Sequence, residues 1–215
     1  MLRKTILACA LSCALVLSGL SYRGTSAIAF AQTGSGSDLY RLNYFSNANT
    51  TGAPDAAVRI ANPGAASNEA TGDNGDLCAM IFVFSSDQQM SECCGCPVTT
   101  NGLRTLSMNK DLTSNPSGSG AKLQNGLIKI VSTQQNGTAP SLCNPSAACS
   151  PTPNLRAWAT HVHGANPAFT ATEEAFEGSN LSSGDFASNA GLVARCSHIT
   201  ASGNGAGQCS CGTDN

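Results

Sequence analysis

The sequence predicts a mainly β protein, a two-layer antiparallel β-sandwich that is reinforced by disulfides and carries a C-terminal helix. Short strand-like segments recur along the chain and are separated by turns rich in Gly, Pro, Asn and Ser. One segment, residues 77–84 (LCAMIFVF), is apolar on both faces, as a central sheet strand would be. Helix-like periodicity is confined to the C-terminal third of the chain.

Seven segments are expected to be strands because they alternate with a period of two or are continuously apolar. They cover residues 39–45, 57–62, 77–84, 97–99, 103–108, 126–132 and 155–162. Asn101-Gly102 separates the fourth segment from the fifth and predicts a β-hairpin between them. The cysteine-rich run just before it is expected at the mouth of this hairpin.

Two segments are expected to be helical, so that the helical part of the chain covers about residues 172–200. The shorter is residues 170–178 (TATEEAFEG), and the longer is residues 182–200 (SSGDFASNAGLVARCSHIT). In the longer helix Ser183 fits the N-cap position, and Gly191 weakens the interior. The residues expected to share its apolar stripe are Phe186, Val193, Cys196 and Ile199.

The N-terminus has the pattern of a secretory signal peptide, residues 1–31. Two basic residues precede an apolar run at residues 5–20, and the small-residue site Ala29-Phe30-Ala31 follows. Residues 32–37 are expected to be a flexible leader, and residues 38–215 a single domain. The apolar run is shorter than a bilayer span, so no membrane insertion is expected after cleavage. The expected location is therefore secreted or periplasmic.

The net charge and the distribution of Lys and Arg exclude some classes of binding partner. Without residues 1–31 the chain has eight Lys and Arg against thirteen Asp and Glu, a net charge of about −5 with His neutral. No Lys/Arg cluster or basic stripe occurs, which argues against nucleic acid as a partner and against a basic membrane-binding face. A cell-surface or extracellular partner remains open.

Nine cysteines follow residue 31, and in an exported protein they are expected to form disulfides. They are Cys78, Cys93, Cys94, Cys96, Cys143, Cys149, Cys196, Cys209 and Cys211. Because nine is odd, one thiol is left over unless it joins an intermolecular bond or a metal site. The bridges are expected to reinforce a hydrophobic core, since the cysteine content is below that of a pure disulfide scaffold.

The sequence alone leaves the pairing open. Neighbouring side chains on an extended backbone point to opposite faces, so Cys93 and Cys94 should reach different partners. The pairings considered are Cys78 with this cluster, Cys143 and Cys149 with each other or with the cluster, and Cys196 with Cys209 or Cys211.

A metal or redox role for Cys93, Cys94 and Cys96 is the alternative. A zinc ribbon needs two C-x-x-C pairs, and Cys93-x-x-Cys96 is the only one in the sequence. A thioredoxin-like pair normally begins a helix, whereas here Pro97 and a hairpin are expected to follow.

His161-Val162-His163 would place two imidazoles on one face of a strand, which is half of a zinc or copper site. The third ligand would have to come from elsewhere, with His198 and Glu173 as candidates. The simpler interpretation is a pair of surface histidines at a strand end. No cofactor is expected.

No catalytic motif is present: G-x-S-x-G and H-E-x-x-H are both missing from the sequence. The leading hypothesis is therefore a non-enzymatic extracellular or cell-surface module for structure, adhesion or ligand binding. The alternatives are a metal-binding or redox protein that uses the cysteine cluster, and a secreted hydrolase with an unrecognised site.

The run GDLCAMIFVFSSDQQMSECCGCPVTTNGLRTLSMN, with DLTSNP and LRAWATH further along the chain, resembles a group of small cysteine-rich proteins secreted by bacteria. The resemblance covers most of the chain after residue 31. It implies a bacterial exported protein and carries no activity or catalytic residue that transfers to this chain.

Overall fold

The structure is a computed structural model that describes residues 40–64, 75–118, 120–137, 141–179, 183–201 and 203–212. The expected signal peptide and leader, residues 1–31 and 32–37, lie outside the described residues.

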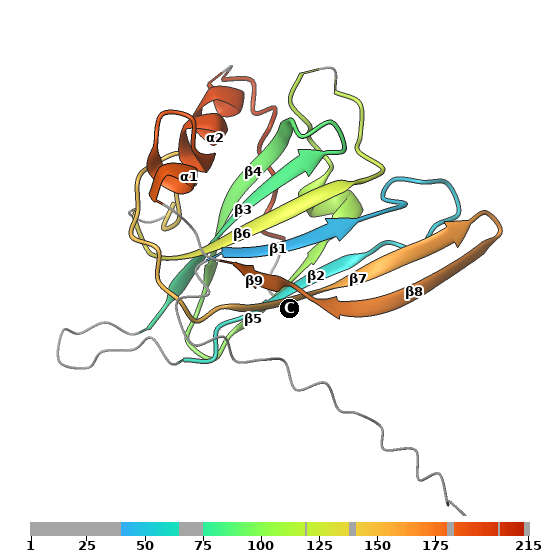
Figure 1. Ribbon diagram of the computed structural model, residues 1–215, viewed down its shortest axis with the longest axis horizontal. Helices are drawn as coiled ribbons and strands as arrows, with labels where there is room; N and C mark the ends of the chain where they lie inside the picture. Colours follow the sequence, from blue (N-terminus) through green and yellow to red (C-terminus); the bar gives the residue numbers. More distant parts are fainter. Residues whose placement is uncertain are drawn as a thin grey trace, which may run out of the picture. The chain divides into compact units, whose positions relative to one another are not determined.

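Two antiparallel sheets form the body of the described chain, and a short helical segment follows them (Figure 1). The five-stranded sheet has the order β4-β3-β6-β1-β9, and the four-stranded sheet has the order β5-β2-β7-β8. The mainly β, disulfide-reinforced sandwich that the sequence predicts is confirmed. The strands are β1 (Tyr40–Phe45), β2 (Ala57–Ala61), β3 (Leu77–Ser85), β4 (Met90–Val98), β5 (Leu103–Ser107), β6 (Gly126–Gln134), β7 (Arg156–Ala165), β8 (Ala168–Ala175) and β9 (Glu177–Ser179).

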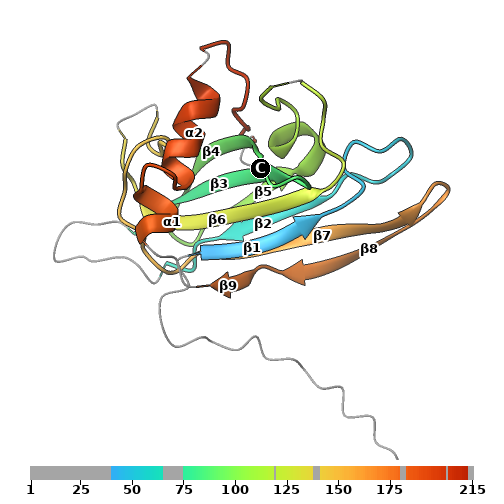
Figure 2. The same cartoon turned by 45° about the horizontal axis from the view of Figure 1, so that its top comes forward.

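The five-stranded sheet lies between the four-stranded sheet and the helices α1 (Ser183–Ala187) and α2 (Leu192–Thr200) (Figure 2). Strand β3 is buried on both faces for this reason, as its continuous apolar sequence predicts. Ile81 and its same-face neighbours pack with the four-stranded sheet. Phe82 and its same-face neighbours pack under the helices, with the Phe82 and Phe186 ring centroids 6.4 Å apart.

The predicted hairpin at Asn101-Gly102 is wrong, although the turn itself is present. The amide of Gly102 donates to the carbonyl of Thr99 over 2.7 Å, and Asn101 has a left-handed φ of 60°. The strands on either side, β4 and β5, belong to different sheets, because β5 pairs with β2. The turn therefore carries the chain from one layer of the sandwich to the other.

The predicted helix at residues 170–178 is also wrong, since these residues form β8 and β9. Strand β8 pairs along its whole length with β7, and β9 pairs with β1. A helix here would bury little, because Phe176 is the only fully buried side chain that the structure describes between residues 170 and 178. Thr170 and Thr172 favour the extended backbone, and pairing with β7 supplies the backbone hydrogen bonds.

Residues 183–200 form two helices where the sequence predicts one. The break covers residues 188–191 and ends at Gly191, which caps α2. Gly191 lies so close to the carbonyl of Phe186 that an added Cβ would be 2.7 Å from the oxygen. The predicted apolar stripe is present across the break, because Phe186, Val193 and Cys196 are buried against the five-stranded sheet.

Glu92 is a fully buried carboxylate on β4. Its Oε1 accepts a hydrogen bond from the amide of Asn115 over 3.1 Å, while Oε2 has no partner among the described residues. Burial raises the pKa of Glu92 to about 8, and the Asn115 hydrogen bond and the charge of Lys122 only partly oppose this.

This burial predicts a pH-dependent stability. Between the ordinary pKa of 4.5 and the folded value of about 8, the native state holds a proton that the unfolded chain has released. The free energy of unfolding should therefore fall as pH rises through this window, by up to about 1.4 kcal/mol per pH unit. Urea unfolding of Glu92→Gln, without reductant, should match the unsubstituted protein at pH 4 and be clearly more stable at pH 9.

Glu177→Gln is the matched control, because Glu177 is an exposed acid on β9. It should keep the pH profile of the unsubstituted protein. Parallel profiles for Glu92→Gln and the unsubstituted protein would show that the buried carboxylate is not the source of the pH dependence.

Candidate functional site

The cysteine cluster lies within β4 and is crosslinked on both faces of the five-stranded sheet. Cys93 faces the helices and pairs with Cys196 of α2, with Cα atoms 5.8 Å apart. Cys94 and Cys96 point toward the interior of the sandwich. They pair with Cys209 and Cys211 of the C-terminal segment, at Cα separations of 5.1 and 5.3 Å.

The fourth disulfide joins Cys78 of β3 to Cys143, with Cα atoms 5.6 Å apart. The register of β3 with β4 explains why Cys78 does not pair with the cluster. Cys94 and Cys96 lie on the other face of the sheet, and Cys93 lies on the same face as Cys78 but opposite Phe82, whereas Cys78 lies opposite Pro97. Two other pairings considered from the sequence are also wrong. Cys196 is bonded to Cys93 and not to Cys209 or Cys211. Cys143 is bonded to Cys78 and not to Cys149.

Cys149 is the one free thiol among the described residues. It is half-buried, and burial raises the pKa of the Cys149 thiol, which a hydrogen bond with Thr133 partly offsets. A thiol with a raised pKa is a poor nucleophile at neutral pH.

The sulfur atoms of Cys94, Cys96 and Cys211 lie within 4.8 Å of one another, a spacing that also suits a metal ion. Two of these sulfurs bond to each other and the third bonds to Cys209. Because thiolates bind metals and disulfide sulfurs do not, the cluster in this state holds no metal and offers no redox thiol.

The C-terminal segment also covers the free edge of β4. The amide of Cys93 donates to the carbonyl of Gly207 over 2.9 Å, and the amide of Cys209 donates back to the carbonyl of Cys93 over 3.2 Å. A short parallel bridge at Gln208 results. This pairing protects an edge that would otherwise expose unpaired backbone groups.

A second cluster lies on the β7–β8 hairpin, where the structure brings together His161, His163 and Glu174. The two histidines are two residues apart on β7 and so share a face. In the β7–β8 register Glu174 lies opposite Ala159, which places its side chain diagonally next to His161. One ligand atom from each of the three lies within 4.8 Å of the others.

His161 is fully buried, and neither of its ring nitrogens has a hydrogen-bond partner among the described residues. Its Nδ1 is 3.8 Å from Oε2 of Glu174. The ring of Tyr44 packs edge-on against it, with centroids 4.1 Å apart. Burial lowers the pKa of His161, and the charge of Glu174 acts in the opposite direction.

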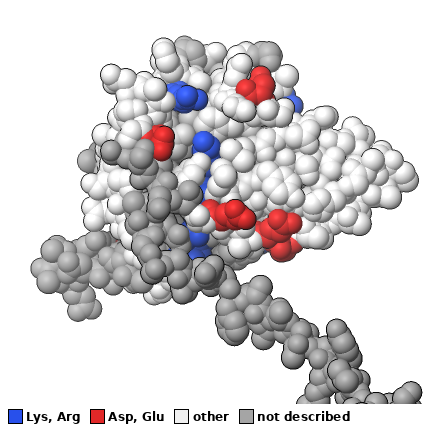
Figure 3. Space-filling view, viewed as in Figure 1, with Lys and Arg blue, Asp and Glu red and all other residues white. Residues whose placement is uncertain are grey.

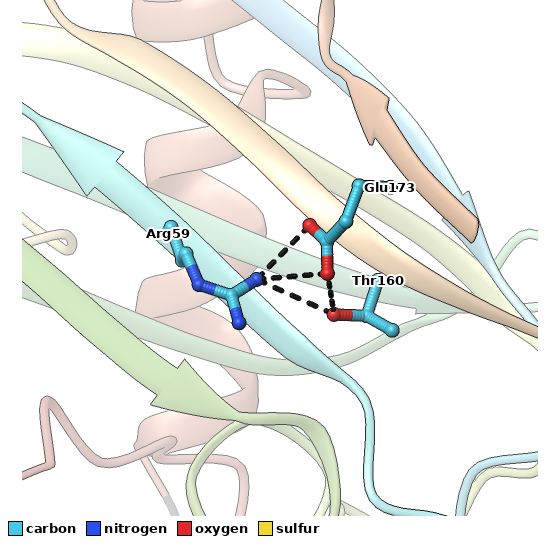
Figure 4. Close-up of polar contacts among 3 residues, drawn as sticks. All are labelled: Arg59, Thr160 and Glu173. Carbon is cyan, nitrogen blue, oxygen red and sulfur yellow. Dashed lines mark hydrogen bonds and ion pairs between the residues drawn. The ribbon is translucent and has the colours of Figure 1, made fainter. Parts of the chain in front are cut away.

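The third ligand suggested from the sequence is not the one that the structure places beside the histidines. Glu173 lies on the opposite face of the hairpin, where it forms an ion pair with Arg59 at 3.0 Å and a hydrogen bond with Thr160 (Figure 4). His198 lies on α2 and is not part of the cluster. The sequence predicts a helix for the segment that contains Glu174, and the β7–β8 register that brings Glu174 beside His161 has no signal in the local pattern.

A cleft of about 620 Å³ opens where β1, β3 and β6 meet α2, and we call it the β6–α2 cleft. Its apolar lining includes Phe45, Phe84 and Leu127, and two cations, Lys129 and Arg195, also line it. The Lys129 ammonium lies 4.8 Å from the ring centroid of Phe84. Nothing in the sequence pattern links β6 to α2, so the cleft is not foreseeable from the sequence.

Comparison with known proteins found no matching family model, curated protein or solved structure. No helix among the described residues has the length and apolar character needed to cross a bilayer. The four disulfides are those of a stabilised, extracellular-type module and are consistent with an extracellular or periplasmic location.

The disulfide arrangement predicts one reactive thiol after residue 31. Alkylation of the purified protein under denaturing conditions, without reductant and with chelator, should add one label to this part of the chain, at Cys149. Intact mass followed by peptide mapping provides the measurement. Three or more labels, or a label on Cys93, Cys94 or Cys96, would contradict the pairing.

Proposed function

We propose that the protein is an exported, non-enzymatic module that binds a small anionic ligand with an apolar part in the β6–α2 cleft. The observation that carries this proposal is the pairing of two cations with an apolar lining in one cleft. Ligand sites commonly combine an apolar wall with a few polar groups that fix orientation.

The charges in the cleft favour an anion. Lys129 is partly buried, and burial lowers its pKa; the charge of Arg195 lowers it further, while Asp185 partly opposes both. The two cations are therefore close enough to repel each other. A bound carboxylate, sulfonate or phosphate would relieve that repulsion and form charge-assisted hydrogen bonds with both side chains.

The composition of the cleft favours binding over catalysis. Its lining among the described residues includes the hydroxyl groups of Ser46, Ser85 and Ser86, but no histidine, cysteine or carboxylate. A serine hydroxyl is a weak nucleophile unless a neighbouring base activates it. Together with the crosslinked state of the cysteine cluster, this supports a binding module rather than a hydrolase or a redox protein.

The export signal expected at residues 1–31 and the disulfide framework support a site that faces the periplasm or the exterior. A small ligand rather than a macromolecule is favoured by the size of the cleft, since about 620 Å³ falls in the range of small-molecule sites.

The proposal is tested with 8-anilinonaphthalene-1-sulfonate, which combines an aromatic body with one anionic group. Its fluorescence should saturate at one equivalent per chain. Arg195→Gln and Lys129→Met should each weaken binding about tenfold, since each removes one charge-assisted contact.

Arg156→Gln is the matched control, because Arg156 is an exposed cation on β7, in the other sheet. It should bind the dye as the unsubstituted protein does. Equal affinity in all four proteins would overturn the proposal. Cooperative thermal unfolding of each variant distinguishes loss of the site from loss of the fold.

A further inference from the structure

We propose that His161, His163 and Glu174 form a binding site for a divalent transition-metal ion that imidazole favours, zinc or copper. The site lies on the β7–β8 hairpin, and its residues do not line the β6–α2 cleft, so the inference is independent of the ligand proposed above.

The hairpin supplies the three ligands from adjacent strands. Their ligand atoms lie within 4.8 Å of one another, whereas three ligands around one zinc ion, each about 2.1 Å from it, lie about 3.4 Å apart. Rotation of the side chains is enough to bring the ligand atoms from their present spacing to that of a bound zinc ion. His163 is half-buried and the Glu174 side chain is 47% exposed, so both have room to turn without a change in the backbone.

His161 gives the independent observation that points to a ligand. A buried imidazole ordinarily has a hydrogen-bond partner, because leaving its polar atoms unpaired costs free energy. Here neither ring nitrogen has a hydrogen-bond partner in the part of the chain that the structure describes. Nδ1 of His161 and Oε2 of Glu174 are 3.8 Å apart. This distance is too long for a hydrogen bond but close to the spacing of two ligands that bind one ion.

The surroundings orient the other histidine and shield the buried one. Nε2 of His163 lies 3.0 Å from Oγ1 of Thr172, a β8 residue that lies directly opposite His161 in the strand register. This contact leaves Nδ1 of His163 available to a metal ion, and a hydrogen bond on the second ring nitrogen orients the ring in known metal sites. The Tyr44 ring closes one side of His161.

The charge of the hairpin favours a cation. Glu173, Glu174 and Glu177 are all exposed, and acidic side chains gather over β8 and β9 on the face shown in Figure 3. Arg59 neutralises Glu173 on the opposite face, which leaves Glu174 for the site. A locally negative surface attracts cations and raises their rate of association.

The ligand set selects the class of metal. Two imidazoles suit zinc and copper, while calcium and magnesium prefer sites made of oxygen atoms. With three protein ligands a fourth position stays open to water or to a ligand, as in exchangeable and catalytic zinc sites and unlike closed structural ones. The ion would therefore be exchangeable and would not be needed for folding.

Isothermal titration of the chelator-treated exported protein with ZnCl₂ and, separately, CuSO₄ tests the site. One equivalent of at least one of the two ions should bind per chain, and MgCl₂ should not. Glu174→Gln and His163→Gln should each weaken binding at least about tenfold. For copper, the electron paramagnetic resonance spectrum should show nitrogen ligands that are reduced in number in His163→Gln.

The chain offers matched controls. Glu173→Gln removes the neighbouring acid on the opposite face, and His198→Gln removes a histidine of α2; both should bind metal as the unsubstituted protein does. Cys149→Ser excludes binding by the free thiol. Glu174→Gln and His163→Gln both leave the buried His161 in place, so each variant should fold.

Two outcomes would overturn the inference. One is no binding of either ion. The other is equal weakening by Glu173→Gln and Glu174→Gln, which would show only diffuse attraction to an acidic surface. Dye binding in the β6–α2 cleft should be unchanged in all these variants, so failure of one proposal is distinguishable from failure of the other.

Discussion

The covalent attachment of β4 to the C-terminal segment is the constraint on which the rest of this fold depends. Three disulfides meet at β4: one joins it to α2 on one face of the sheet, and two join it to the C-terminal segment on the other. Alternation of side chains along an extended strand makes this possible, because Cys93 and Cys94 necessarily point to opposite faces. The same crosslinks hold the tail over the free edge of the sheet.

This attachment also builds the β6–α2 cleft. Cys196 anchors α2 to the five-stranded sheet, and Arg195 is the residue next to it. The position of one cation of the cleft is thus set by a disulfide, while the other, Lys129, is set by the register of β6 between β3 and β1. Two elements distant in sequence contribute one charge each to the same cleft.

The sequence predicts the features that depend on local pattern and misses those that depend on pairing between distant segments. The apolar β3 and the opposite orientations of Cys93 and Cys94 follow from period-two alternation. The Asn101-Gly102 turn is visible in the sequence, but which sheet each flanking strand joins is decided by β2. Glu174 joins the histidines only because β8 pairs with β7, and an acid-rich segment of eight residues gives no local sign of that partner.

The spans of the four disulfides also describe the unfolded chain. The paired cysteines are 65, 103, 115 and 115 positions apart in the sequence, and all four loops begin at or after Cys78. The oxidised polypeptide is therefore a set of overlapping closed loops with a linear N-terminal arm, and its denatured state is more restricted than that of the reduced chain. Strands β1 and β2 belong to that arm, yet each lies in the interior of its sheet, between β6 and β9 and between β5 and β7. In the oxidised unfolded chain, the part with the greatest conformational freedom thus supplies one interior strand to each of the two sheets.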